Sequence, residues 1–121
     1  MRIIIFEDDK KKSRIMEKAL YDAEPLAEIT AFAKTTDVLA YVERYQPEVA
    51  FISLENPDGR GYFLIKKMKN ISQRTNVIVV ASRYRFLKEI MGLRVSGYVI
   101  GELTKEIVAD EIAHLRYSYI R

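Results

Sequence analysis

The chain begins, after Met1-Arg2, with Ile3-Ile4-Ile5-Phe6-Glu7-Asp8-Asp9, a short apolar run that ends in three carboxylates. A second apolar run, Val49-Ala50-Phe51-Ile52, ends in Ser53. Apolar runs of this length without polar alternation are typical of strands buried on both faces of a parallel sheet. Two strands therefore end at chemically different loops, one acidic and one carrying a single hydroxyl group.

Apolar runs of strand length alternate with amphipathic stretches of helix length along the chain. This alternation predicts an α/β fold with one five-stranded parallel sheet and helices on both faces, in which a strand-helix unit occurs five times. The predicted strands are 3–6, 27–32, 49–54, 77–81 and 98–100, and the predicted helices are 10–21, one from Thr35 or Thr36, 62–69, 83–95 and one after Thr104. In such sheets, the functional residues lie at the carboxyl ends of the strands.

The composition indicates one folded domain spanning residues 1–121. No cysteine is present, so disulfides, thiolate metal sites and cysteine nucleophiles are excluded. The net charge of +3 is small, which argues against direct nucleic-acid binding by this domain. No stretch reaches the ~18 apolar residues of a membrane span, and the first strand leaves no room for a signal peptide, so we expect no membrane contact and a cytoplasmic location.

The acidic loop Glu7, Asp8 and Asp9 has two interpretations. Adjacent carboxylates are oxygen ligands of the kind that Mg²⁺ takes, so a weak magnesium site is possible at Glu7 and Asp8. Alternatively, the acidic residues only complement the dipole of the helix that follows them. Either way, the acidity argues against a nucleotide or flavin phosphate bound in this loop.

Four segments together carry a resemblance to a known family: the runs 3–9 and 46–54, the turn with Pro57 and Gly61, and the run 96–100. In combination they resemble the CheY-like receiver domains of two-component response regulators, most closely those that precede a DNA-binding module of the LytTR type. The resemblance covers the whole chain. It implies the flavodoxin-like receiver fold and a role in phosphorelay signal transduction.

Part of the family's site is retained. Its acidic pair corresponds to Glu7 and Asp8, and its aromatic switch residue corresponds to Tyr98. The phosphoacceptor aspartate, however, corresponds to Ser53, and the lysine after the fifth strand corresponds to Gly101.

The family's switch hydroxyl at the end of the fourth strand corresponds to Ala81, although Ser82 follows directly. A one-residue bulge would be needed for Ser82 to restore the hydroxyl. Lys105, one helical turn beyond Gly101, is poorly placed to replace the lost lysine.

These losses affect one mechanism. A serine hydroxyl, unlike an aspartate, must be deprotonated before it can attack a phosphoryl group. The single histidine, His114, is far in sequence from every strand end, and we expect it to be a partly buried helix residue. The sequence therefore predicts a pseudo-receiver that is not phosphorylated on aspartate, has no catalytic residues and requires no cofactor.

Three functions remain open. The first is a protein-interaction or dimerisation module in signalling, and the second is the regulatory half of a DNA-binding transcriptional regulator. The third, more remote, is an enzyme of flavodoxin-like fold. For the first we expect a homodimer or partner contact through the fourth helix, the fifth strand and the last helix. The candidate interface residues are Tyr84, Ile90, Arg94, Tyr98, Arg116, Tyr117 and Tyr119.

Overall fold

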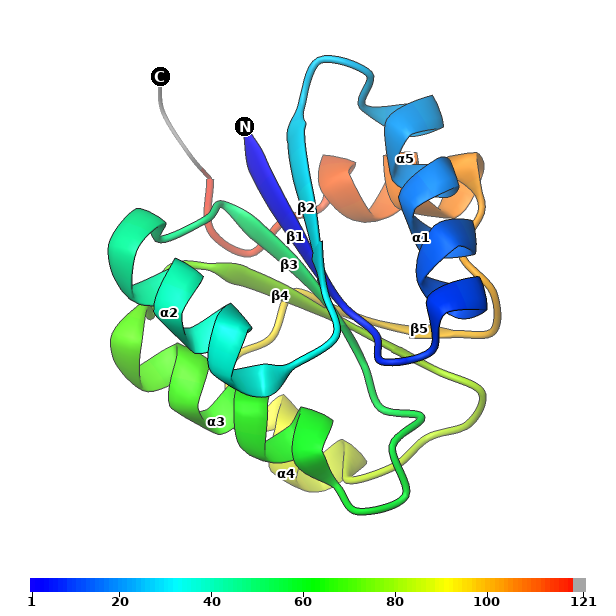
Figure 1. Cartoon of the computed structure of the whole chain (residues 1–121). Coiled ribbons are helices and arrows are strands. Elements are labelled where there is room, and N and C mark those ends of the chain that lie inside the picture. The colour runs from blue at the N-terminus through cyan, green and yellow to red at the C-terminus, as the bar shows by residue number, and fades with distance from the viewer. Residues whose placement is uncertain (119–121) are drawn as a thin grey trace.

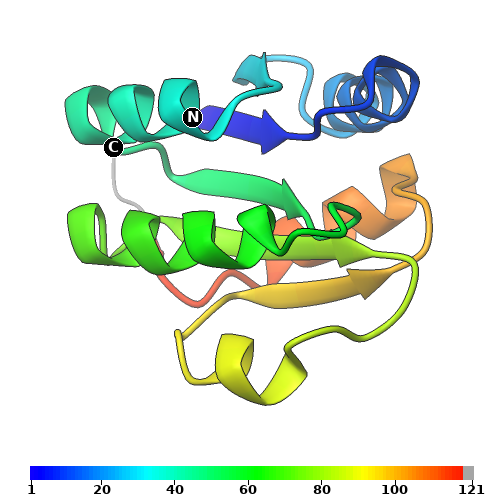
Figure 2. The same cartoon turned by 60° about the horizontal axis from the view of Figure 1, so that its bottom comes forward.

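The computed structural model describes residues 1–118 and contains one parallel sheet of five strands in the order β2-β1-β3-β4-β5. Figure 1 labels the strands, and the colours identify them in Figure 2, where β1, β3, β4 and β5 all run in one direction. The strands are β1 Arg2–Phe6, β2 Glu28–Phe32, β3 Val49–Ser53, β4 Asn76–Ala81 and β5 Gly97–Ile100. The predicted α/β fold with a five-stranded parallel sheet is confirmed.

Helices cover both faces of this sheet (Figure 1). One face packs against α1 and α5 through side chains that include Leu20 and Val108. The other face packs against α2, α3 and α4, whose buried side chains include Val42, Leu64 and Ile90. The helices are α1 Lys10–Ala23, α2 Thr35–Tyr45, α3 Arg60–Ile71, α4 Leu87–Met91 and α5 Lys105–Ala113.

The central strands are apolar because both of their faces are covered. Every residue of β3 and β4 is buried, and successive residues alternate between the two helix layers. Phe6 pairs with Ile52, and Ile52 pairs with Val79, so the carboxyl ends of β1, β3 and β4 reach the same edge of the sheet. That edge is where the predicted site residues meet.

The fourth helix is much shorter than the predicted 83–95, because α4 contains only Leu87–Met91. Phe86 precedes it with a left-handed backbone (φ +52°), and Arg94 follows with another (φ +57°). Helical residues do not adopt these angles, so both positions interrupt the amphipathic pattern. Ile90 is the one residue of α4 that is buried in the core, at 0% exposure.

Within residues 1–118, no helix combines the length and the apolar character that crossing a membrane requires.

Candidate functional site

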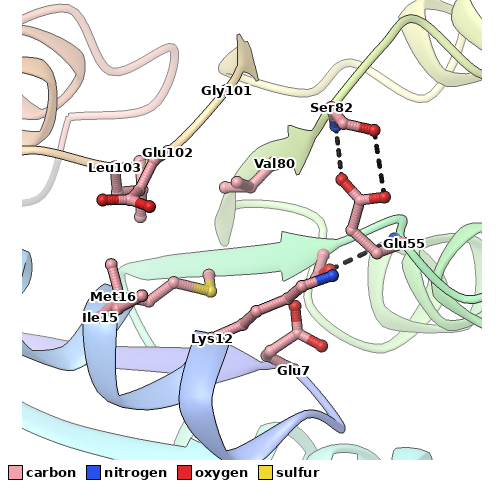
Figure 3. Close-up of a pocket in the computed structure, with 11 residues that line it drawn as sticks. Glu7, Lys12, Ile15, Met16, Glu55, Val80, Ser82, Gly101, Glu102 and Leu103 are labelled. Carbon is pink, nitrogen blue, oxygen red and sulfur yellow. Dashed lines mark hydrogen bonds between the residues drawn. The ribbon is translucent and has the colours of Figure 1, made fainter.

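A pocket of about 320 Å³ lies at the edge where β1, β3 and β4 end (Figure 3). Four of the predicted site residues line it together: Glu7, Ser53, Ser82 and Gly101. Its other lining residues are Lys12, Ile15, Met16, Glu55, Val80, Glu102 and Leu103. The structure therefore brings these four residues together, and it adds Lys12, Glu55 and Glu102, which were not among the predicted site residues.

Glu7 and Ser53 form the buried floor of this pocket, with 3% and 1% of their surfaces exposed. Glu7 accepts a hydrogen bond from the backbone N–H of Asp9 at 3.1 Å. The pKa of the Glu7 carboxyl is raised, chiefly because burial disfavours its charged form, while the Asp9 N–H and the Ser53 hydroxyl act in the opposite direction. Ser53 is thus a neutral partner of Glu7 at the position that corresponds to the family's nucleophile.

The Glu55 carboxylate bridges the ends of β3 and β4. It accepts hydrogen bonds from the backbone N–H of Ser82 and, at 3.2 Å, from the Ser82 hydroxyl (Figure 3). The backbone N–H of Glu55 in turn donates to Ser53 Oγ at 3.3 Å. A carboxylate of the chain itself therefore occupies both hydrogen-bond donors that Ser82 presents at the end of β4.

Ser82 reaches the pocket without a bulge in β4. Ala81 is buried, pairs with Ile100 of β5 and is the last residue of the strand. Ser82 is the first residue beyond the strand, where its side chain is free of the strict alternation of faces. A hydroxyl group is therefore present at the rim of the pocket, although Ala81 occupies the expected switch position.

A lysine enters the pocket from an unexpected element. Gly101 leaves open space, because a Cβ placed there would meet no atom within 4 Å. Lys105, in contrast, is exposed at the start of α5 and does not line the pocket. Lys12, in the first turn of α1, lines it and extends its ammonium group toward Glu55 and Glu7 in Figure 3.

The other two acidic residues of the first loop have separate roles. Asp9 caps α1 by accepting a hydrogen bond from the backbone N–H of Lys12 at 3.0 Å, and this bond is the main cause of its lowered pKa. Asp8 accepts hydrogen bonds from Asn56 Nδ2 at 3.0 Å and from Arg60 at 3.3 Å. Of the two interpretations of the acidic loop, the one in which an acidic residue complements the start of the helix therefore applies to Asp9.

The residues present fit a divalent cation poorly. Among residues 1–118, no three histidine, cysteine, aspartate or glutamate side chains gather closely enough to hold a metal ion. Glu7 and Asp8 supply two carboxylates, and the guanidinium of Arg60 already pairs with Asp8. Mg²⁺ needs several oxygen ligands in a nearly octahedral arrangement, so a cation here would have to displace that pairing.

Tyr98 fixes the loop that leaves β4. Its hydroxyl accepts a hydrogen bond from the backbone N–H of Arg85 at 2.7 Å and donates one to the Arg85 carbonyl at 2.9 Å. The Arg85 guanidinium donates to the carbonyl of Leu54 at 2.6 Å and to that of Asn56 at 3.2 Å. The loops after β3 and β4 are thus joined to each other, and Tyr98 joins them to β5.

The predicted interface residues differ in how much of their surface is exposed. Tyr84 is 62% exposed and Arg94 is exposed, but Ile90 has no exposed surface, so its assignment to an exterior contact was wrong. Ile90 is the side chain that anchors the short α4 in the core. Because α4 has only five residues, little more than one helical turn, Ile90 is its one residue buried in the core.

Arg116 and Tyr117, near the end of the described chain, lie beside Ser96 and Asn76. Asn76, at the start of β4, accepts a hydrogen bond from the Tyr117 N–H and donates one to the Tyr117 carbonyl, both at 2.7 Å. Tyr117 is therefore at the opposite end of β4 from Tyr84, with exposed Arg116 beside it. Tyr119 lies outside the described residues. His114 is exposed rather than partly buried, and its Nδ1 lies 2.8 Å from the Asp110 carbonyl oxygen.

No protein-family model matches the chain, and no curated protein matches it. Solved structures do. The signal receiver domain of a DNA-binding response regulator (merR) from Colwellia psychrerythraea 34H has a TM-score of 0.81 and 19% identity, over 93% of this chain and 95% of that one. The bacteriophytochrome response regulator RtBRR has a TM-score of 0.79 and 20% identity, over 99% and 80%.

The bacteriophytochrome response regulator AtBRR has a TM-score of 0.79 and 17% identity, over 99% of this chain and 95% of that one. TM-scores near 0.8 show a common architecture. Sequence identities of 20% or less do not show a common chemistry, which has to be argued from the residues of the site. The chain therefore has the fold of the receiver domains of response regulators.

Proposed function

We propose that this protein is a receiver-like signalling domain of a two-component pathway that acts through protein contacts and is not phosphorylated on aspartate. The observation that carries the proposal is the Glu55–Ser82 bridge above Ser53. The position of the nucleophile holds a neutral hydroxyl, and the donors beside it are already paired with an internal carboxylate. In this account the domain works in the cytoplasm and is not an enzyme.

The electrostatics of the pocket oppose phosphoryl transfer. That reaction needs an anionic or activated nucleophile and cationic groups that offset the negative charge of the transferred group. Ser53 is neutral, and the carboxylates of Glu7, Glu55 and Glu102 line the pocket together with a single lysine, Lys12. An incoming phosphoryl group would therefore meet an excess of like charge. We propose accordingly that the domain needs no cofactor and that Mg²⁺ binds only weakly at Glu7 and Asp8.

We propose further that the domain pairs with itself or with a protein partner through α4, β5 and α5. Exposed apolar side chains support this proposal, since Met91 on α4 is 56% exposed and Ile100 on β5 is 40% exposed. Charge supports it as well. α5 carries Lys105, Glu106, Asp110 and Glu111, whereas α4 carries Lys88 and Glu89 and is followed by Arg94. In a symmetric dimer, Lys88 and Arg94 of each copy would face the acidic residues of α5 in the other copy.

A second candidate is the regulatory half of a DNA-binding regulator of the LytTR type, in which DNA would be bound by a different domain. The favouring observation is the match to the Colwellia psychrerythraea domain, which is named as part of a DNA-binding response regulator. The two candidates are compatible, because a dimer of regulatory domains can bring two DNA-binding modules together.

Sedimentation velocity over a wide range of protein concentration tests the dimer. We expect a reversible dimer that Arg94→Glu weakens about tenfold or more, because the substitution places like charges across the interface. Leu26→Ala is a matched surface control, since Leu26 is 97% exposed and lies between α1 and β2. A monomer at every concentration, together with partner binding that Arg94→Glu leaves unchanged, would exclude this surface.

A further inference from the structure

Three aromatic side chains form a cluster at the start of α3 and α4, away from the site pocket. The rings of Tyr62 and Phe86 stack with their centroids 4.8 Å apart and their planes 8° apart. Phe63 lies beside Tyr62, with the ring centroids 5.4 Å apart. Phe63 is 56% exposed and Phe86 is 38% exposed, so the folded chain leaves much of this cluster uncovered. We call Tyr62, Phe63 and Phe86 the aromatic corner.

The aromatic corner is held in a defined shape. Phe86 has a left-handed backbone, which a bulky residue adopts only when its surroundings impose it. Gly59 lies beneath the rings, because a Cβ placed there would be 3.6 Å from Phe86 and 3.9 Å from Phe63. The preceding residue, Arg85, is fixed by its bonds to Tyr98 and to the loop after β3. The rings are therefore preorganised for contact with another molecule.

Positive charge surrounds the aromatic corner. Lys66 Nζ lies 5.6 Å from the centre of the Tyr62 ring and 6.0 Å from that of Phe63. Arg85 Cζ lies 5.7 Å from the centre of the Phe86 ring. Between positions 60 and 94 the chain has nine lysines and arginines and one acidic residue, whereas its total net charge is only +3. Lys66 and Arg85 are the cations beside the rings, whereas Arg60 pairs with Asp58 and Asp8, and Arg74 lies near Ser118 at the other end of α3.

We propose that the aromatic corner binds an acidic segment of another protein. An apolar side chain of that segment would pack against the rings of the corner, and its acidic residues would lie beside Lys66 and Arg85. Apolar centres with charged rims are typical of protein–protein contacts, and aromatic residues are the usual anchors. A second copy of the same corner would bring like charges together, which disfavours self-association here. The stacking of Tyr62 on Phe86 already uses one face of each ring, which leaves less ring surface for stacked nucleotide bases than an open aromatic platform has.

The test uses a synthetic amphipathic peptide of glutamate, aspartate, leucine and phenylalanine, titrated into ¹⁵N-labelled protein and followed by NMR. We expect shifts confined to residues near 59–67 and 84–88, and an affinity that falls as the salt concentration rises. Three other probes are titrated in parallel: the same peptide with lysine in place of its acidic residues, a single-stranded oligonucleotide, and vesicles of anionic phospholipid.

The variants separate the apolar anchor from the charge. Phe63→Ala should weaken binding about fivefold or more, which is the effect expected for an anchor residue of an interface. Lys66→Glu should weaken binding to a similar extent while it leaves all three rings in place. Leu26→Ala, at a more exposed apolar residue between α1 and β2, should leave binding unchanged. No shifts with the acidic peptide, equal binding of the lysine peptide, or tighter binding of the oligonucleotide or the vesicles would each overturn the proposal.

Discussion

The Glu55 carboxylate accepts hydrogen bonds from both the backbone N–H and the hydroxyl of Ser82, which joins the ends of β3 and β4 across 27 positions of the sequence. Glu55 lies two residues beyond Ser53, the last residue of β3, and its side chain lines the same pocket. The bridge gives the site a built-in negative group, and the conformation of the loop after β4 depends on it.

Removing the bridge should destabilise the fold. Glu55→Ala removes the charged acceptor of two Ser82 donors, but Ser82 is exposed and water can replace that acceptor, so we expect a loss of about 0.5–1.5 kcal/mol. Glu55→Gln keeps one acceptor oxygen and should cost less. Urea denaturation of the three proteins measures the difference. Equal stability of the wild type and Glu55→Ala would mean that the bridge contributes nothing.

Neutralising Glu7 should have the opposite effect at neutral pH. Burial raises the Glu7 pKa in the folded chain, so the folded state binds more protons than the unfolded state just above the ordinary pKa of glutamate. The stabilising effect of the protonated form is lost as the pH rises through the folded pKa, and at pH 7 the charged form is a net cost. We therefore expect Glu7→Gln to be more stable than the wild type at pH 7, on the scale of about 1 kcal/mol, with a smaller difference at pH 4.

Melting temperatures of both proteins between pH 4 and 8 would check this. A Glu7→Gln protein that is less stable than the wild type at pH 7 would show that the Glu7 charge is needed, for example by a tightly bound cation.

The lowered pKa of Lys69, at the opposite end of the sheet, predicts a second dependence of the stability on pH. This buried side chain donates to the carbonyls of Gln73 at 2.7 Å and Thr75 at 3.1 Å. Burial, followed by the nearby charges of Arg116 and Arg94, lowers its pKa to about 8. The unfolded chain then binds more protons between pH 8 and 10.5, so stability should rise with pH in that window.

The rise should be about 2 kcal/mol between pH 7.5 and 9.5, at 1.36 kcal/mol per unit of pKa difference. Chemical denaturation of the wild type at both values measures it. Lys69→Met should lack this component, whereas Lys67→Met, an exposed lysine of the same helix, should retain it. An identical pH dependence in all three proteins would contradict the low pKa.

The sheet and the position of the pocket could be predicted because they depend on local sequence. The apolar runs ending in Glu7 and Ser53 identify buried strands, and parallel strands bring their carboxyl ends to one edge. The strand-end rule pointed to Glu7 and Ser53, and the family resemblance added Ser82 and Gly101, which line the same pocket. Glu55 could not be predicted in the same way, because it lies beyond the end of β3, where the alternation of faces no longer fixes the direction of a side chain.

Other features depend on contacts between distant segments. Arg60 pairs with Asp8 across 52 positions, which no local pattern reveals. The helix predicted over 83–95 had the right period, but the Tyr98 hydroxyl binds the Arg85 backbone and leaves only Leu87–Met91 helical. Ile90 was consequently assigned to the surface although it is buried. Lys12 had no predicted role, and its position in the first turn of α1 brings it into the pocket.

Intact-mass spectrometry after incubation with Mg²⁺ and a small phosphodonor tests the central claim most directly. A receiver domain with its aspartate serves as the positive control, and Ser53→Asp shows whether the nucleophile alone is sufficient. We predict that the wild type keeps its mass and that Ser53→Asp gains little, because Glu55 still occupies the Ser82 donors and no lysine stands at Gly101. A wild-type protein that gains one phosphoryl group, removable by hydroxylamine, would contradict the account.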